Sequence, residues 1–460
     1  MKLPNGPQSP AVLQMLRWIT SPMSFMETCA ERYGDMFTVR LASKSPPLIF
    51  VSNPEVLEQI LTNDTKGLEA PGDTNLVFES LLGKGSVITI SGAEHQRQRQ
   101  LLLPPFHGER MRSYSQIISD ITEKVISQYQ IGQPFNIRSA AQAITLRVIM
   151  QAVFGLNEGP RAEKLQHFLG EMLEKGSSVL SVAFLYFPAL QRDFGPINFW
   201  GKQMRRQQDA DKLIYEEIQE RREQPDPSRT DILSLLMAAR DEAGQPMTDE
   251  ELRDELMTLL VAGHETTATA IAWAFYWIHK IPSVRQKLLQ ELDSLGDNPD
   301  PSAIFKLPYL NAVCSETLRI YPVAMLTFPR VVRTPLSLGG YELEPDTSVI
   351  GSIYLTHQRE DLYPEPKQFK PERFLERQFS PYEYLPFGGG ARRCIGLAFA
   401  QLEMKLALAK ILSSRELELV DNGDVRPKRR GLVTGPDRPI EMVVTSQRQV
   451  KSSVLQTSTV

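Results

Sequence analysis

Residues 387–396 read FGGGARRCIG, a run of glycines followed by two arginines and one cysteine. Cys394 is one of three cysteines, and an isolated cysteine is more often a small buried apolar residue than a ligand. The surrounding residues favour a ligand. Consecutive glycines let a backbone approach a flat cofactor closely, and a tight turn before a helix directs amide hydrogens at a sulfur. We therefore predict that the Cys394 thiolate is the axial ligand of a haem iron.

Other residues of the segment suit the same role. The guanidinium of Arg392 can bind a haem propionate through two parallel hydrogen bonds, and the ring of Phe387 can shield the sulfur from water. A phosphate-binding loop is excluded because the sequence contains neither GxxxxGKS/T nor GxGxxG. A purely structural turn would not require Phe, Gly, Arg and Cys together at these spacings.

The segment resembles the haem-binding loop of the cytochrome P450 monooxygenases, whose pattern Phe-x-x-Gly-x-Arg-x-Cys-x-Gly it matches at every fixed position. The match includes Gly396, which the resemblance assigns to the cofactor site. It implies haem b (iron protoporphyrin IX) and an enzyme that inserts one atom of O2 into a C–H or C=C bond. It also implies a mainly α fold with a small β-rich lobe, in which the haem is buried between a long central helix and the cysteine loop. In its overall sequence pattern the chain resembles soluble bacterial hydroxylases of fatty acids, retinoids and terpenoids, including those of cyanobacteria.

A second motif, AGHETT at residues 262–267, lies in the longest expected helix. The hydroxyl of Thr266 can bond to the carbonyl of Ala262, which loosens the helix, and Gly263 leaves room for a small ligand against the backbone. Helical threonines are common, but the family has an acidic residue followed by threonine at this place. The resemblance therefore implies that Thr266 and Glu265 supply protons to bound oxygen. Ala262 and Gly263 would then contact the cofactor.

His95 and Arg99 are four residues apart, so they share one face of a helix and suit a common anion. They could equally be two exposed polar residues. The family has Trp or His, then Arg four residues later, in contact with the haem propionates, and the resemblance assigns that role to this pair. Arg330, eleven residues after Arg319, is a weaker candidate for the same contact.

The segments ETLR at residues 316–319 and PERF at 371–374 resemble a structural element of the family. Glu316 and Arg319 lie one helical turn apart, and by themselves they are typical of a surface ion pair. The resemblance implies that Arg373 joins them in a trio that supports the cysteine loop and takes no part in the chemistry.

The composition is that of an ordinary globular protein, with 42% apolar residues, 23% charged residues and a formal net charge of −4. This balance offers no basis for a nucleic-acid partner. Strands are expected at residues 35–41, 46–52, 336–338 and 348–354, and most of the chain between 54 and 320 has a helical pattern.

The clearest helix begins where Thr248 forms a capping box with Glu251, and it meets no proline before Pro282. Its length of about 30 residues would span about 45 Å, so the helix should cross the core. A final helix is expected at residues 397–412. We predict one haem-thiolate domain over residues 1–445 and a polar, disordered tail at 446–460.

The cysteines are few and scattered, and the sequence shows no charged-then-apolar leader and no apolar segment of membrane length. We therefore expect a cytoplasmic protein without a transmembrane anchor. The chain has no flavin or iron–sulfur motif, so electrons from NAD(P)H should arrive through a ferredoxin or flavodoxin and its reductase. Arg97, Arg393 and Lys405 could meet such an acidic partner, or they could be ordinary solvated charges.

Segments that line the substrate pocket in the family are mainly apolar in this sequence. The resemblance places eight residues in the pocket: Phe78, Leu81, Val87, Leu259, Val323, Leu326, Phe328 and Val433. The apolar segment at 176–190 would form a lip at the entrance. Because apolar pockets take apolar ligands, the expected substrate is a long-chain fatty acid, an alkane or a terpenoid.

Three other functions remain open at this point: a peroxide-driven haem-thiolate hydroxylase or isomerase, a non-catalytic haem sensor or carrier, and a non-haem thiol enzyme with Cys394 as nucleophile. The first would work with peroxide alone, the second would consume no electrons in response to a substrate, and the third would be colourless. The presence of both Glu265 and Thr266 argues against the first.

Overall fold

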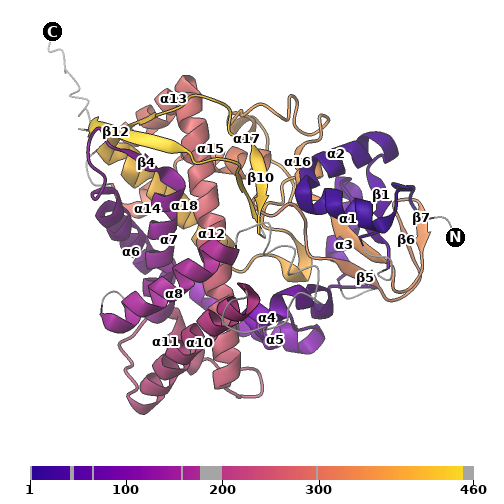
Figure 1. Ribbon diagram of the computed structural model, residues 1–460, viewed down its shortest axis with the longest axis horizontal. Helices are drawn as coiled ribbons and strands as arrows, with labels where there is room; N and C mark the ends of the chain where they lie inside the picture. The colour runs from indigo at the N-terminus through magenta and orange to yellow at the C-terminus, as the bar shows by residue number, and fades with distance from the viewer. Residues whose placement is uncertain are drawn as a thin grey trace, which may run out of the picture.

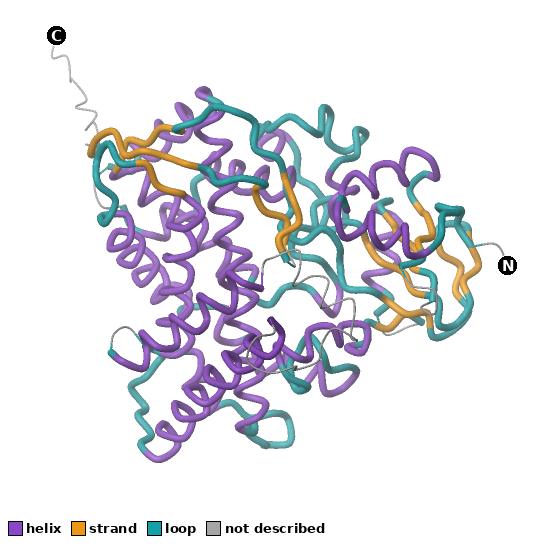
Figure 2. Tube along the Cα trace, in the orientation of Figure 1, coloured by secondary structure: helices purple, strands orange, loops and turns teal. Residues whose placement is uncertain are grey.

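The computed structural model describes residues 3–41, 46–64, 67–156, 159–176, 199–296, 299–431 and 433–448. A helix-rich body surrounds the long helix α12. A smaller lobe near the N-terminus contains strands such as β1, β5, β6 and β7 (Figure 1). Figure 2 shows that helices dominate the body and that the strands gather in separate small groups. The predicted mainly α fold with a small β-rich lobe is confirmed.

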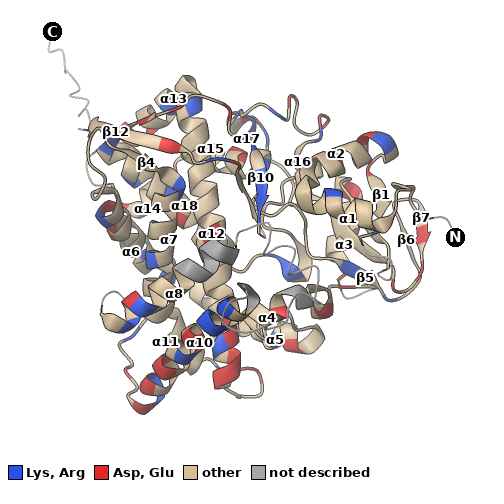
Figure 3. Ribbon diagram, viewed as in Figure 1, with Lys and Arg blue, Asp and Glu red and all other residues tan. Residues whose placement is uncertain are grey.

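The described helices follow one another along the whole chain. They are α1 (Ala11–Thr20), α2 (Pro22–Tyr33), α3 (Pro54–Thr62), α4 (Glu79–Leu82), α5 (Gly92–Leu102), α6 (Arg110–Ile126), α7 (Ile137–Phe154), α8 (Pro160–Gly176), α10 (Phe199–Glu223), α11 (Ile232–Ala238), α12 (Asp249–Lys280), α13 (Pro282–Asp293), α14 (Pro301–Phe305), α15 (Pro308–Ile320), α16 (Ile353–His357), α17 (Arg373–Glu376) and α18 (Leu397–Ser414). Acidic and basic side chains are interspersed along α10, as Figure 3 shows, which is typical of a solvated helix.

The strands form small sheets from distant parts of the chain. They are β1 (Met36–Val39), β2 (Leu48–Val51), β3 (Leu68–Glu69), β4 (Pro134–Asn136), β5 (Arg330–Val332), β6 (Leu336–Leu338), β7 (Tyr341–Leu343), β8 (Ser348–Gly351), β9 (Arg415–Leu419), β10 (Pro427–Arg430), β11 (Val433–Pro436) and β12 (Glu441–Gln447). The largest sheet has the order β1-β2-β8-β5-β3, and β2 pairs with β8 in parallel. The smaller sheets are β4-β12-β9, β10-β11 and β6-β7.

The strand expected at residues 348–354 is shorter than predicted. It ends at Gly351, and the Ser352 hydroxyl then accepts a hydrogen bond from the Leu355 amide at 3.3 Å and caps α16. A side-chain oxygen that satisfies a free amide is the usual device for starting a helix. The alternating pattern alone did not distinguish this short helix from a longer strand.

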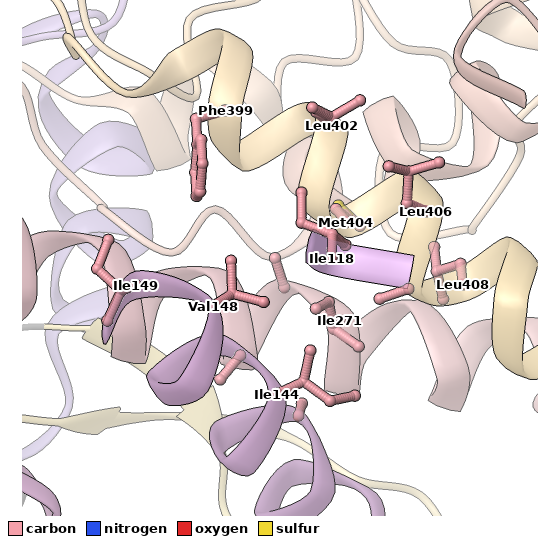
Figure 4. Close-up of a cluster of buried hydrophobic side chains, with 14 of the residues drawn as sticks. Ile118, Ile144, Val148, Ile149, Ile271, Phe399, Leu402, Met404, Leu406 and Leu408 are labelled. Atoms are coloured by element: carbon pink, nitrogen blue, oxygen red, sulfur yellow. The ribbon is translucent and has the colours of Figure 1, made fainter. Parts of the chain in front are cut away.

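Helix α12 begins as predicted. The Thr248 hydroxyl accepts from the Glu251 amide at 3.1 Å, and the Glu251 carboxylate accepts from the Thr248 amide at 2.7 Å. The helix continues for 32 residues. Its central part packs against α7 and α18, and Figure 4 shows Ile144 and Val148 of α7 meeting Ile271 of α12 beneath the apolar side chains of α18.

The C-terminal strand extends slightly further than expected. β12 continues to Gln447, and its last two residues, Ser446 and Gln447, pair with Glu416 and Arg415 of β9. The tail that we placed at 446–460 therefore begins at least two residues too early, and residues 449–460 lie outside the described part of the chain. Within the described ranges, no helix combines the length and apolar character needed to cross a bilayer.

Candidate active site

A cavity of about 330 Å³ lies between the middle of α12 and the cysteine loop at residues 387–396. Cys394 lines it from the loop, and Ala262, Gly263 and Thr266 line it from α12. Residues that are more than 120 positions apart in the sequence therefore meet across one space. This is the arrangement that the sequence predicts for a haem iron and bound oxygen.

The cysteine loop presents its sulfur to the cavity. The Cys394 amide donates to the Phe387 carbonyl at 3.0 Å, and α18 begins three residues later. Burial of the site raises the pKa of the Cys394 thiol, whereas a hydrogen bond from the Gly396 amide and the charges of Arg99 and Arg393 act in the opposite direction. These donors and cations stabilise a thiolate, as an iron ligand requires.

Two of the loop glycines, Gly389 and Gly390, are required by contacts within the protein rather than by closeness to a cofactor. A Cβ atom on Gly390 would lie 2.2 Å from Asp64 Oδ2, and one on Gly389 would lie 2.7 Å from Leu61 Cδ1. These glycines therefore bring the loop against the end of α3. Gly396 differs, because its Cβ position faces open space and the residue lines the cavity.

Thr266 lies where the sequence predicts. Its hydroxyl donates to the Ala262 carbonyl at 2.6 Å, and both residues line the cavity. Gly263 also lines the cavity, and a Cβ atom there would approach Ile149 to 3.0 Å. The predicted bond from the Thr266 hydroxyl to the Ala262 carbonyl is therefore present, within an α-helix that continues unbroken.

Glu265 does not line the cavity, and its role as a proton relay stays a prediction. Its carboxylate forms an ion pair with Arg138 and accepts from Gln142 at 2.8 Å, and it lies 3.4 Å from the Thr269 hydroxyl. Successive residues of an α-helix point about 100° apart. When Thr266 faces the cavity, Glu265 must therefore face α7.

His95 and Arg99 of α5 both line the cavity, as predicted. Burial, followed by the nearby charges of Arg392 and Arg99, lowers the pKa of His95 to about 4, so its ring is neutral at pH 7. No described residue forms a hydrogen bond or an ion pair with the Arg99 guanidinium. A half-buried cation without a partner is suited to an anionic group of a ligand.

The contact of Arg330 with a haem propionate stays a prediction, although other groups take most of its donors. The residue is fully buried and does not line the cavity. Its guanidinium binds Asp64 at 2.6 Å and the carbonyls of Phe328 and Gly389 at 2.6 and 2.9 Å. Nearly all its donors are used, so Arg330 ties β5 to the cysteine loop.

Arg392 lines the cavity, but it also has many partners. Its guanidinium donates to the carbonyls of Ala70 at 2.7 Å, Val87 at 2.5 Å and Ile90 at 2.6 Å. A further bond from Nε to Ala70 leaves one of its five N–H groups available. Its contact with a propionate stays a prediction, limited to that remaining donor.

The predicted structural trio is present. Arg319 donates to the Glu316 carboxylate at 2.6 and 2.8 Å, and Arg373 lies 3.2 Å from the same carboxylate. The three side chains are buried, and backbone carbonyls such as that of His357, at 2.8 Å from Arg319, take other donors. None of the three lines the cavity.

Of the three cations that could meet a redox partner, only Arg393 is exposed beside Cys394. Arg97 binds Asp241 and Glu251, each at 2.6 Å, and so joins α5 to the start of α12. Lys405 is buried, with its ammonium 3.8 Å from the centre of the Phe305 ring. Arg97 is therefore engaged in ion pairs at a partly exposed position, and Lys405 belongs to the interior.

Five of the eight predicted substrate-pocket residues line the cavity: Val87, Leu259, Val323, Leu326 and Phe328. Phe78, Leu81 and Val433 do not, although Val433 is buried in β11. The predicted lip at 176–190 falls almost entirely outside the described residues. Two polar residues that the sequence analysis missed, Glu255 and Thr258, also line the cavity. Glu255 follows a run of charged residues at the start of α12, so nothing in the sequence distinguished it from a solvent-facing carboxylate.

The residues present fit a haem. The cavity has a thiol on one wall and small residues on the opposite wall, and its other lining side chains are mainly apolar. Arg99 provides an unpartnered cation at the same cavity, as the propionates of a haem would require. The described residues hold no cluster of His, Cys, Asp and Glu that could bind a metal directly, so the candidate ligand is the single thiolate.

The family model described as "Cytochrome P450" matches residues 4–443. The chain belongs to the cytochrome P450 family. The cytochrome P450 135B1 of Mycobacterium tuberculosis (strain H37Rv) is 34% identical over 98% of this chain and 93% of its own length. The cytochrome P450 138 of Mycobacterium bovis is 31% identical over 95% of each.

Solved cytochrome P450 structures have the same fold. A cyanobacterial member, CYP120A1, solved with retinoic acid bound, superposes with a TM-score of 0.83 and 25% identity over 97% of this chain and 100% of that chain. The haem domain of cytochrome P450DA superposes equally well at 22% identity, which shows the fold alone. This P450 chain is therefore a haem-dependent monooxygenase, as its resemblance in sequence implied.

Proposed function

We propose that this cytochrome P450 oxidises a long apolar molecule, such as a fatty acid, an alkane or a terpenoid, at a C–H or C=C bond. The observation that carries the proposal is the apolar lining of the cavity between Thr266 and Cys394. Its members beyond the haem-facing residues include Val87, Ile88, Ile149, Leu259, Val323, Leu326 and Phe328. An apolar cavity binds apolar ligands because their burial removes apolar surface from water.

A structural relative supports this class of substrate. The cyanobacterial CYP120A1 was solved with retinoic acid, and its fold covers nearly all of this chain. Retinoic acid is an apolar molecule with one carboxylate. A ligand of that kind falls within the class that we propose for the cavity.

Each site residue has a physical role in the proposed reaction. Cys394 would hold the haem iron through its thiolate, and Arg99, with the neutral ring of His95, would bind the propionates. The haem, when bound, supplies the activation of O2, and electron donation from the thiolate favours O–O cleavage. Thr266 holds a proton at Oγ1 beside the cavity and accepts a replacement from water.

We propose that the electrons come from NAD(P)H through a separate ferredoxin or flavodoxin with its reductase, and that the enzyme works in the cytoplasm. Arg393, exposed next to Cys394, is the cation best placed to meet an acidic partner. All three cysteines are free, which agrees with a reducing compartment.

The spectrum of the reduced protein under carbon monoxide tests the thiolate ligand. We expect a Soret band at about 450 nm in the wild-type protein and its loss in Cys394→Ser. A band at about 420 nm in undamaged protein, or no band, would contradict the assignment. The substrate class is tested by titration with fatty acids, alkanes and terpenoids, of which at least one should shift the iron from low to high spin.

Thr266→Ala tests the role of the hydroxyl. We expect this variant to keep the carbon monoxide band but to release more peroxide for each NAD(P)H consumed, because a proton donor beside the oxygen is lost. Unchanged product formation per electron would contradict the proton role. Turnover with peroxide alone, and none with a ferredoxin system, would instead favour a peroxide-driven enzyme.

A further inference from the structure

Polar side chains in the first turns of α12 hold the loop at residues 83–90, which forms one wall of the cavity. Two carboxylates accept from backbone amides of the loop: Asp254 from Gly85 and Glu255 from Val87, each at 2.8 Å. The Thr258 hydroxyl shares a hydrogen bond of 2.7 Å with the Ser86 hydroxyl. Arg253 donates to the carbonyl of Leu82, the residue just before the loop, at 3.2 Å. The loop is therefore attached to the same helix that carries Thr266.

The backbone of Val87 is held on both of its sides. Its amide donates to Glu255 Oε1, and its carbonyl accepts from Arg392 Nη1 at 2.5 Å. Glu255 belongs to α12, and Arg392 belongs to the cysteine loop. The side chains of Val87 and Ile88 line the cavity, so these two bonds fix where apolar groups stand beside the site.

Glu255 is an unusual residue for this position. It is fully buried, it lines the cavity, and its Oε2 has no hydrogen-bond partner within the described part of the chain. Burial raises the pKa of its carboxyl well above the ordinary range, with the Val87 amide acting in the opposite direction. The Val87 amide is the one hydrogen-bond partner of the Glu255 carboxyl within the described part of the chain.

We propose that Glu255 is a positioning residue that determines which ligand shapes the cavity accepts, through its hydrogen bond to the Val87 amide. The inference rests on the proposed function, because it takes this cavity to be the substrate site. Without the bond, the Val87 amide is buried and unsatisfied, and the loop must move to find water or another acceptor. Val87 and Ile88 then change their places, while Cys394 and Thr266 keep theirs.

The test uses the haem-loaded protein and two probes that bind the iron directly, imidazole and the bulkier 4-phenylimidazole. The Soret shift gives the Kd of each, and the ratio of the two Kd values reports the space above the iron. Glu255→Leu removes the acceptor, and Glu255→Gln keeps a neutral acceptor of the same size. Glu403→Leu is the matched control, because Glu403 is another buried carboxyl with an unpartnered oxygen and does not line the cavity.

We expect Glu255→Leu to change the Kd ratio by about fivefold or more, and Glu255→Gln to restore it to within about twofold of the wild type. Glu403→Leu should leave the ratio unchanged. A ratio in Glu255→Leu that stays within about twofold of the wild type would overturn the inference, and so would an equal change in Glu403→Leu. The carbon monoxide band of the wild-type protein is recorded first. If that band is absent, the proposed function has failed, whereas a normal band with an unchanged Kd ratio means that only the inference about Glu255 has failed.

Hydrogen exchange provides a second measurement that does not depend on the folding of Glu255→Leu. In the wild-type holoenzyme and in Glu255→Gln, the Val87 amide should exchange at least about tenfold more slowly than the amide of Lys84, an exposed residue of the same loop whose amide has no hydrogen-bond acceptor among the described residues. Equal exchange of these two amides in the wild type would show that Glu255 does not hold the loop, and the inference would then be wrong.

Discussion

Two buried groups of carboxylates and guanidiniums in this protein use the same chemistry in different ways. In the trio of Glu316, Arg319 and Arg373, the carboxylate binds both arginines, and backbone carbonyls take most of the remaining donors. In the pair of Glu265 and Arg138, the carboxylate joins α12 to α7, and the Arg138 Nε has no partner within the described ranges. The first group is closed, whereas among the described residues the second keeps an unsatisfied donor, Arg138 Nε, in the ion pair with Glu265, the residue before Thr266.

The difference teaches that the completeness of the hydrogen bonding, rather than the pairing itself, separates a structural ion pair from one that is available to a reaction. A closed group cannot change partners without leaving a charge unpaired in the interior. A group with a free donor can exchange one partner for water or for another side chain at lower cost. Four experiments test this comparison, from the largest expected effect to the smallest.

Arg319→Ala should have the largest effect. It leaves the Glu316 carboxylate buried with one remaining cation, so we expect a loss of about 3–5 kcal/mol in the free energy of unfolding. Denaturant unfolding followed by fluorescence and the haem content of the purified protein measure it. Arg319→Lys is the control. Its stability should fall between those of the wild type and Arg319→Ala, because a lysine keeps the charge but cannot bind both carboxylate oxygens in parallel. A loss below about 1 kcal/mol would contradict the scaffold role.

Acid should destabilise the protein through buried neutral histidines in both regions. Burial, followed by the charge of Arg319, lowers the pKa of His357 to about 3, and burial lowers that of His264 to about 4. The unfolded chain binds protons below pH 6.5, where the folded rings do not, so the stability falls as the pH drops from 6.5 towards 4. For His357 alone the expected loss over that range is about 3 kcal/mol.

His357→Gln should flatten this acid dependence. A glutamine is long enough to accept the hydrogen bond that the Leu385 amide now donates to His357 Nε2 at 3.0 Å, but it binds no proton. Unfolding measured from pH 7 to pH 4 should therefore show a smaller slope than the wild type. His264→Asn is the matched variant beside Glu265. Slopes equal to the wild type in both variants would show that other groups cause the acid loss.

Glu265→Gln should cost less than Arg319→Ala. Arg138 is partly exposed and Gln142 remains nearby, so we expect a loss of about 2 kcal/mol in stability. The same variant tests the relay, since Glu265 faces α7. We expect the fraction of electrons lost to peroxide to rise less than it does in Thr266→Ala. A larger rise in Glu265→Gln would show that the carboxylate reaches the oxygen by leaving Arg138.

Lys287→Ala should have the smallest effect, and it sets the baseline for an exposed pair. Lys287 lies 2.7 Å from Glu372, which precedes Arg373 of the trio, but both side chains are substantially exposed to solvent. Such pairs contribute about 0–1 kcal/mol. Thermal unfolding at low and high salt measures it. A loss comparable to that of Arg319→Ala would mean that proximity to the trio, rather than burial, controls the energy.

The parts of the fold and the site that could be predicted depend on local signals. The capping box of Thr248 and Glu251 is a contact between neighbours, so the start of α12 was predictable to the residue. The contact of Thr266 with Ala262 and the pairing of Glu316 with Arg319 lie within one helical turn, and both were also predictable. The error at β8, where Ser352 starts a helix instead of continuing the strand, arose because both structures suit the same short apolar run.

Long-range partners could not be predicted. Arg392 is the stronger and Arg330 the weaker candidate for a propionate ligand in the sequence, but Asp64 binds Arg330, and the carbonyls of Ala70, Val87 and Ile90 hold most of the Arg392 donors. From the sequence alone, Lys405 could be an ordinary solvated charge. In the structure it is buried against the ring of Phe305. Nothing near these residues in sequence identifies the groups that they meet.

By itself, the sequence determined the family, and it predicted the thiolate ligand and the oxygen-side threonine, because each rests on residues at short fixed spacings whose chemistry is set by the backbone between them. Only the tertiary structure decided which charged groups face the cavity. It turned Glu265 towards α7, paired Arg330 with Asp64, gave Arg99 no partner among the described residues and brought Glu255 to the Val87 amide. The reason is physical: a buried charge or amide must find a partner, and that partner is chosen by packing between segments that are far apart in the chain.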